Sequence, residues 1–253
     1  MRSLFLSDVH LGAFSRRTEE EVETDLLSII EYCTSESVKI YLLGDLFDYW
    51  MEYPNYIPPL GKKVLDHFER YNTLCGPASF ITGNHDYWDM GHFSERGFEV
   101  EYEYMQIEIG TKKGLLLHGD GLTDPRFGIP RPRLNNLLRA HWFVAFFQHI
   151  FPGPTGNSLM KFFSDFTREE NASDTARLSE WAEMFLNESD FNFIVSGHDH
   201  VPRMETYPSG TYINTGAFFK RRTALLYTED GPQLVSIADG TLQAFNGYIP
   251  KTS

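Results

Sequence analysis

Aspartate, histidine and asparagine side chains recur in five short motifs within the first 200 residues. They are Asp-Val-His at 8–10, Gly-Asp-Leu-Phe-Asp at 44–48, Gly-Asn-His-Asp at 83–86, His-Gly-Asp at 118–120 and Gly-His-Asp-His at 197–200. Carboxylate, imidazole and amide oxygen groups together suit Mn²⁺, Fe or Zn²⁺ rather than thiophilic ions. The neighbouring glycines allow sharp backbone turns and close approach. The motifs therefore predict metal-dependent chemistry.

The number of candidate ligands indicates more than one ion. Seven ligands exceed the needs of one tetrahedral ion, but they suit two ions that share a carboxylate about 3.5–4 Å apart. A single such motif is weak, because Asp and Asn are also ordinary turn residues. Five motifs in one chain are hard to explain as turns alone. The candidates are Asp8, His10, Asp45, Asn84, His118, His198 and His200.

Each motif directly follows an apolar run that is typical of a buried strand. The runs lie at 4–6, 38–43, 79–81, 115–118 and 193–195, and helical apolar spacing separates the first three at 18–33 and 61–74. This alternation predicts a largely parallel sheet with right-handed crossovers. Since the carboxyl ends of such strands form one binding edge, the five motifs are expected to meet there.

The rest of the chain predicts a second sheet and a helical insertion. Residues 102–109 and 115–118 have the pattern of a hairpin with its turn at 111–114, and further strands are expected at 211–214, 223–227 and 234–237. The interval 121–190 is mostly helical in character. We therefore expect one α/β domain spanning 1–253, a sandwich of two β-sheets flanked by helices, with an insertion at 121–190.

Composition excludes several classes of protein. The 253 residues include 22 Lys and Arg against 35 Asp and Glu, a net charge of −13, so a basic footprint for nucleic acid is absent. No apolar run approaches the length of about 18–20 residues needed to cross a bilayer. The two cysteines form no C-x-x-C pair, which argues against a thiolate zinc site. With no signal peptide apparent, a cytoplasmic location is expected.

The ordered set of motifs resembles the calcineurin-like metallophosphoesterases over about residues 1–220. The resemblance implies two metal ions at the strand ends of a double β-sandwich. One ion would be held by Asp8, His10, Asp45 and His200; the other by Asp45, Asn84, His118 and His198, with Asp45 bridging. It also implies a catalytic pair, in which His85 acts at the leaving group and Asp48 holds it. Mn²⁺ is the first expectation for the metal, with Fe or Zn²⁺ as alternatives.

A narrower resemblance is to the UDP-2,3-diacylglucosamine diphosphatases of lipid A synthesis. It is carried by Gly-Asp-Leu-Phe-Asp-Tyr-Trp at 44–50, Leu-His-Gly-Asp-Gly-Leu at 117–122 and the helical insertion. It implies hydrolysis of UDP-2,3-diacylglucosamine to UMP and 2,3-diacylglucosamine 1-phosphate, with the insertion as a lid. Two positions depart from that pattern: His85 stands where Arg is frequent, and Asp199 where Thr is frequent. A general phosphatase or phosphodiesterase acting on a soluble nucleotide or other phosphoester is the alternative, and a non-catalytic metal-bound scaffold is a third interpretation.

The insertion combines apolar and cationic residues. Every residue from Trp142 to Phe147 is apolar, and four arginines lie nearby, at Arg126, Arg131, Arg133 and Arg139. This combination suits a UDP-linked lipid and peripheral contact with the inner membrane surface. The alternative is that 131–151 packs against the apolar face predicted at 173–186. Candidate substrate contacts are Asn84, His85, Asp124, Arg126 and Trp142; the oligomeric state is left open by the sequence.

Overall fold

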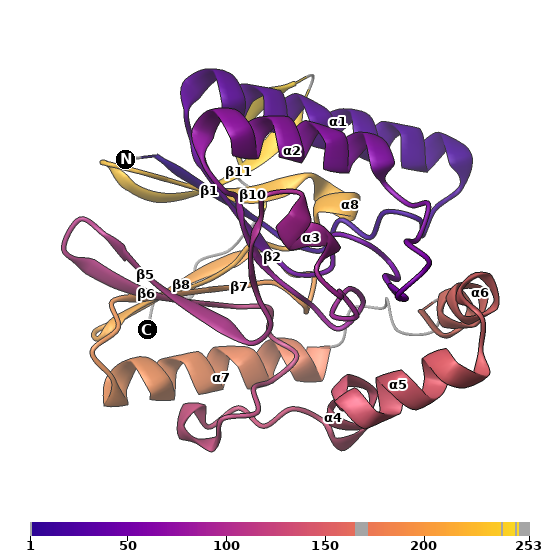
Figure 1. Cartoon of the computed structure of the whole chain (residues 1–253). Helices are drawn as coiled ribbons and strands as arrows, with labels where there is room; N and C mark the ends of the chain where they lie inside the picture. Colours follow the sequence, from indigo (N-terminus) through magenta and orange to yellow (C-terminus); the bar gives the residue numbers. More distant parts are fainter. Residues whose placement is uncertain (1, 165–171, 239, 246, 248–253) are drawn as a thin grey trace.

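Two β-sheets pack face to face in the computed structural model, which describes residues 2–164, 172–238, 240–245 and 247 (Figure 1). The first sheet has seven strands, of which β1 to β4 are parallel and β10 to β12 are joined antiparallel. Their order across the sheet is β12 (Thr241–Ala244), β11 (Gly231–Ala238), β10 (Thr223–Thr228), β1 (Ser3–Leu6), β2 (Lys39–Leu43), β3 (Ser79–Ile81) and β4 (Glu99–Glu101).

The second sheet has five strands with a parallel centre. Strands β6, β7 and β9 run parallel, and β5 and β8 pair antiparallel at the two edges. Their order is β5 (Tyr104–Ile109), β6 (Lys112–Leu117), β7 (Phe193–Ser196), β9 (Gly210–Asn214) and β8 (Arg203–Tyr207). Both sheets therefore contain neighbouring parallel strands whose carboxyl ends can deliver side chains to one edge.

Helices cover the outer faces of both sheets (Figure 1). Helices α1 (Arg16–Glu36) and α2 (Lys62–Cys75) pack on the first sheet, where Val22, Leu26 and Phe68 are fully buried. Helix α7 (Ala172–Glu188) packs on the second sheet through residues such as Leu178 and Trp181. Two short helices, α3 (His92–Glu95) and α8 (Phe218–Arg221), complete the part of the sandwich that the structure describes.

A separate apolar cluster holds the two sheets together. Phe5, Leu43 and Ile81 of the first sheet meet Leu116 and Val195 of the second, and all five are buried. Burying a side chain of this size stabilises the fold by about 1.5–3 kcal/mol. The strands therefore fix the relative position of the two sheets, and with it that of the loops at their ends.

The predicted α/β sandwich of two sheets is confirmed, with differences in detail. Strands β4, β8 and β12 were not predicted. The hairpin turn expected at 111–114 is wrong: Ile109 pairs with Lys112, so the loop is only Gly110 and Thr111. Gly110 has φ +63°, a conformation that such two-residue hairpin loops require and that glycine adopts without strain.

Between β6 and β7 the chain forms η1 (Pro125–Phe127), α4 (Arg133–Arg139), α5 (His141–Ile150), α6 (Gly153–Ser164) and α7. Figure 1 shows α4, α5 and α6 beyond the end of the sandwich, whereas α7 lies along the second sheet. Phe143 and Phe147 of α5 pack with Met51, Tyr53 and Trp88. The alternative, in which 131–151 packs on 173–186, is not the arrangement found in the described clusters, because α7 packs on the second sheet instead. None of the helices in the described ranges combines the length and the apolar character needed to cross a membrane.

Candidate metal centre

The five motifs converge at the carboxyl ends of β1, β2, β3, β6 and β7. Carboxylate oxygens and imidazole nitrogens form three overlapping groups. Within each group, the potential ligand atoms all lie within 4.8 Å of one another. The groups are Asp8 with His10 and His200, His10 with Asp45 and His85, and Asp8 with Asp45 and His118. Asn84 joins them, since its Oδ1 lies 3.1 Å from His118 Nε2. His198 joins through its ring, 5.0 Å from that of His118.

Backbone strain is concentrated in the same residues. A positive φ is uncommon for a residue with a side chain and persists only where the surrounding structure enforces it. Among the described residues, seven other than glycine have one, and five of these are predicted metal ligands. They are Asp8 (53°), His10 (52°), Asp45 (55°), His198 (76°) and His200 (64°). The strand ends are therefore bent so that these side chains face one another.

Both aspartates are anchored through one carboxylate oxygen. Asp8 Oδ2 accepts hydrogen bonds from the Ser7 hydroxyl and from the His198 N–H at 3.0 Å, while Oδ1 lies 3.4 Å from His200 Nε2. Asp45 Oδ1 accepts from the His85 N–H at 3.0 Å, while Oδ2 lies 3.3 Å from His118 Nε2. One oxygen of each residue is thus fixed, and the other faces the imidazoles.

Two histidines are held with one ring nitrogen directed at the cluster. His118 Nδ1 lies 2.8 Å from the Leu43 carbonyl, to which it can only donate, so Nε2 faces Asp45. His10 Nδ1 lies 3.2 Å from Asp48 Oδ1. His10 Nε2 is buried and has no hydrogen-bond partner in the described part of the chain. Such an orphaned nitrogen amid carboxylates fits a metal ligand.

The predicted pair His85 and Asp48 is adjacent, but through a contact that the sequence did not indicate. His85 Nδ1 lies 2.7 Å from the backbone carbonyl of Asp48, and the Asp48 carboxylate contacts His10. Because a carbonyl only accepts, Nδ1 of His85 carries the hydrogen and Nε2 faces Asp45 Oδ2, 3.9 Å away. Asp48 therefore orients two imidazoles: its backbone carbonyl holds His85, and its carboxylate holds His10.

The carboxylates and imidazoles of the cluster shift one another's pKa values. Burial disfavours the charged form of His118, but the Asp45 carboxylate outweighs it and raises the pKa of His118 to about 10. Burial also opposes ionisation of Asp45, yet the charges of His118 and His85 hold its pKa well below the usual range. Metal binding replaces protons on such ligands. The carboxylate and imidazole donors of the cluster, the unpartnered Nε2 of His10 and the negative charge of the carboxylates all suit divalent cations.

Asp86 ends the Gly-Asn-His-Asp motif at 83–86, where the sequence alone indicated no role for it. Asp86 is fully buried, and it accepts hydrogen bonds from the N–H groups of Gly83 and Leu46, both at 2.7 Å. Burial and the neighbouring Asp45 charge raise its pKa to about 7. Its carboxyl group therefore ties the loop that follows β3 to the loop that follows β2. Its place in the Gly-Asn-His-Asp motif was the available signal.

A buried ion pair braces the last motif. Asp199, between His198 and His200, is 2.7 Å from Arg203 Nη1, and both residues of the pair are buried. Arg203 Nε also donates to the Ser179 hydroxyl of α7 at 3.2 Å. The pair therefore links the loop after β7 to α7. No sequence signal identified it, because Arg203 follows the motif in an otherwise ordinary strand.

The predicted substrate contacts divide into two groups. Asn84 and His85 lie in the cluster, as described above. Asp124, which precedes η1, pairs with Arg126 of η1, and 82% of the Arg126 side chain is exposed. Trp142 is on α5 and 65% exposed. None of the contacts found among the described residues joins these three to the ligand cluster.

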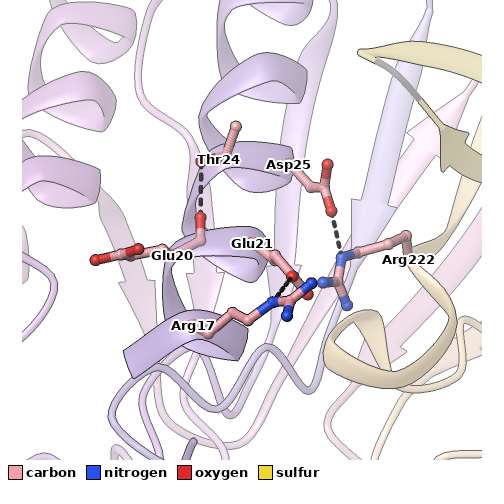
Figure 2. A pocket seen from close by; sticks show the side chains of 6 residues that line it. All are labelled: Arg17, Glu20, Glu21, Thr24, Asp25 and Arg222. Atoms are coloured by element: carbon pink, nitrogen blue, oxygen red, sulfur yellow. Dashed lines mark hydrogen bonds and ion pairs between the residues drawn. The ribbon is translucent and has the colours of Figure 1, made fainter. Parts of the chain in front are cut away.

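A charged hollow of about 520 Å³ lies elsewhere, beside α1 (Figure 2). Arg17 donates to Glu21 at 3.1 Å, and Arg222 donates to Asp25 at 2.6 Å. Each guanidinium is thus neutralised by a carboxylate in the hollow itself. The lining contains carboxylates but no imidazole or thiol, so the hollow lacks the histidine donors that accompany the carboxylates at the strand ends.

Comparison with known proteins identifies the family. The family model described as calcineurin-like phosphoesterase matches residues 1–202. This chain belongs to that family. A calcineurin-like phosphoesterase is a metal-dependent hydrolase, and the family uses divalent metals of the kind that the cluster fits. The predicted family, enzyme class and fold are confirmed.

Relatives are similar over different lengths. A UDP-2,3-diacylglucosamine hydrolase of Porphyromonas gingivalis is 32% identical over 117 residues, which are 46% of this chain and 45% of that protein. A protein of the same name from Shewanella piezotolerans is 22% identical over 246 residues, 95% of this chain and 100% of that protein. The solved structure of vacuolar protein sorting 29 from Cryptosporidium parvum has a TM-score of 0.50 at 12% identity, with 96% and 95% of the chains covered. That likeness concerns the fold alone.

Proposed function

We propose that this calcineurin-like phosphoesterase hydrolyses the pyrophosphate of UDP-2,3-diacylglucosamine to UMP and 2,3-diacylglucosamine 1-phosphate. Relatives named for that activity match almost the full chain. The observation that carries the substrate assignment is an exposed apolar surface on α4 and α5, called here the apolar stripe. It comprises Leu134 and Leu137 of α4 and Trp142, Phe146 and Ile150 of α5, exposed by 63%, 40%, 65%, 57% and 49%.

The apolar stripe is attached to the site. Trp142, Phe146 and Ile150 recur every four residues and so share one face of α5. The opposite face is docked, since Phe147 packs on Trp88, whose indole donates to the Leu138 carbonyl at 3.0 Å. Trp88 lies four positions after Asn84. Acyl chains lying on the apolar stripe would therefore leave the phosphates near the ligand cluster.

We infer the ligand set from the same geometry. Asp8, His10, Asp45 and His200 hold one ion in this proposal, and Asp45, Asn84, His118 and His198 hold the other. Mn²⁺ is the proposed metal, with Fe or Zn²⁺ as alternatives. When bound, such a pair of cations lowers the pKa of a water to near neutrality and stabilises charge on phosphoryl oxygens.

The remaining steps belong to the chain's own groups. With Asn84 Oδ1 directed at His118, its amide nitrogen is the group left to donate to a phosphoryl oxygen. His85 Nε2, held by the Asp48 carbonyl at Nδ1, donates to the leaving oxygen when protonated. In a pyrophosphate the leaving group is a phosphate monoester, which departs with less help from an acid.

The proposed location is the cytoplasmic membrane face, where the lipid is presented. The apolar stripe is flanked by the exposed Arg133, which suits a surface of acyl chains and phosphate headgroups. Contact at this surface is peripheral in the proposal, since the acyl chains alone need to be covered by α4 and α5. The retained His85 favours the alternative, a general phosphoesterase acting on a soluble substrate.

Replacing Trp142, Phe146 and Ile150 together by serine should reduce UMP release from UDP-2,3-diacylglucosamine by about 100-fold or more. Each large apolar side chain contributes about 1.5–3 kcal/mol when buried against the lipid. Hydrolysis of bis-p-nitrophenyl phosphate should be unchanged, because the three side chains are exposed and lie on the face of α5 opposite the one that packs on Trp88. Both rates are measured with Mn²⁺-loaded protein in mixed micelles.

Leu74→Ser is the matched control, because Leu74 is 63% exposed on α2, on the other side of the first sheet. It should affect neither substrate. Undiminished lipid hydrolysis by the triple variant would overturn the role of the apolar stripe. If the wild-type protein cleaves bis-p-nitrophenyl phosphate but never the lipid, the general phosphoesterase alternative holds instead.

A further inference from the structure

Arg139 connects the helical insertion to the loops of the ligand cluster. It is the last residue of α4, and only 10% of its side chain is exposed. Its Nη2 donates to the Gly83 carbonyl at 2.8 Å and lies 3.0 Å from Asp120 Oδ2. Gly83 precedes Asn84, and Asp120 follows His118 by two residues. One guanidinium therefore grips both loops that carry these side chains.

Further contacts fix the guanidinium in place. Arg139 Nη1 donates to the Tyr102 carbonyl at 3.0 Å, and the guanidinium carbon lies 4.6 Å from the centre of the Tyr87 ring. A planar fork of donors can satisfy several acceptors at once, which an ammonium group cannot do in the same geometry. The position of Arg139 is thus determined by three separate segments of the core.

The neighbouring Arg131 cannot replace the contacts of Arg139. Arg131 Nε lies 3.3 Å from Asp120 Oδ2, but its Nη1 and Nη2 donate to Glu103 at 2.8 and 3.1 Å. Two arginines thus balance two carboxylates. Without Arg139, the buried Asp120 would share one cation with Glu103, and the Gly83 carbonyl would lose its donor. Leaving buried polar groups unsatisfied is costly enough to shift the loops.

We propose that Arg139 is a positioning residue, which makes the geometry of Asn84 and His118 depend on the docking of α4. This inference rests on the ligand set of the proposed function. The last turn of α4 is held to the core by the contacts of Arg139 and by the Trp88 indole on the Leu138 carbonyl. The apolar stripe begins on the same helix. Arg139 therefore couples ligand geometry to lipid engagement in this proposal.

The test compares Arg139→Ala with Arg96→Ala. Arg96 is a matched control, since it is 20% exposed and forms two ion pairs, with Asp66 at 2.6 Å and Glu69 at 2.8 Å, on the α2 side of the molecule. Calorimetric titration with Mn²⁺ measures the affinity of each site without catalysis. Loss of a group that orients ligands costs about 10–100-fold in metal affinity or activity. We expect that loss for the weaker-binding ion in Arg139→Ala and none in Arg96→Ala.

Kinetics with bis-p-nitrophenyl phosphate provides the second readout. Arg139→Ala should lower kcat with little change in KM, and added guanidinium at millimolar concentration should restore part of kcat, since the missing group can bind where Arg139 was. A wild-type Mn²⁺ affinity, or a lowered kcat that guanidinium leaves unchanged in folded protein, would overturn the proposal. If Arg139→Ala fails to fold, Arg139→Lys is judged by its Mn²⁺ affinity: weaker binding at an unchanged Tm supports the proposal, and wild-type binding overturns it.

The design separates this inference from the function on which it rests. If the wild-type protein binds fewer than two Mn²⁺ ions, the ligand set itself fails. If the wild type binds two ions and Arg139→Ala does so equally well, only the positioning role fails. The lipid substrate enters neither measurement.

Discussion

Asp45→Asn should lower kcat/KM for bis-p-nitrophenyl phosphate by about a thousandfold or more, because it removes the carboxylate that both proposed ions share. The contribution of the ions to the barrier is several kcal/mol, and each 1.4 kcal/mol is a tenfold change in rate. Asparagine keeps an oxygen for the His85 N–H, but its amide N–H₂ would face the imidazoles of His118 and His10. Steady-state kinetics with saturating Mn²⁺ measures the change.

The same measurement on Asp230→Asn provides the control. Asp230 is exposed in the turn between β10 and β11, and its replacement should leave kcat/KM unchanged. Metal binding of Asp45→Asn, followed by calorimetry, should show the loss of at least one ion. A variant that binds two ions and retains wild-type activity would remove Asp45 from the bridging position.

His85→Ala should have an effect that depends on the leaving group. For a phosphodiester with an alkoxide leaving group, such as a 2′,3′-cyclic nucleotide, loss of a proton donor should lower kcat by about 10²–10⁴-fold. For UDP-2,3-diacylglucosamine the leaving phosphate is stabilised without protonation, so the loss should be about tenfold or less. Rates on the two substrates, measured with the same enzyme preparation, give the ratio directly.

Bis-p-nitrophenyl phosphate is a useful third substrate for this variant. Its leaving group is a stabilised phenolate, so its hydrolysis should follow the pyrophosphate rather than the cyclic nucleotide. Equal losses on all three substrates would mean that the His85 imidazole acts on the ligand cluster as a whole, through Nε2 3.9 Å from Asp45 Oδ2, rather than on the leaving oxygen.

The sequence was sufficient for the parts of the site that depend on residue type and strand position. Asp8 and Asp45 each follow a buried run, and parallel pairing of β1 with β2 places both at one edge. Because both side chains are carboxylates, they suit divalent metal ions rather than thiophilic ions. Because the pleat and the crossover rules determine where strand ends lie, convergence followed from the pattern without any knowledge of distances.

Contacts between side chains and backbone atoms could not be predicted from the sequence. The donor from Arg139 goes to the Gly83 carbonyl, and Asp48 holds His85 through its own carbonyl, so no complementary side chain marks either contact. Strand β4, Glu99–Glu101, is short, polar and at a sheet edge, which makes it resemble a loop. For the insertion, an apolar face indicated burial of α7 but could not say against what: its partner proved to be the second sheet, not α5.

Anomalous diffraction from crystals grown with Mn²⁺ tests the central claim most directly. The account predicts two anomalous peaks about 3.5–4 Å apart at the carboxyl ends of β1, β2, β3, β6 and β7. Asp45 should lie between them, with Asp8, His10 and His200 around one peak and Asn84, His118 and His198 around the other. A single peak, or peaks away from these side chains in protein that hydrolyses phosphodiesters, would contradict the account.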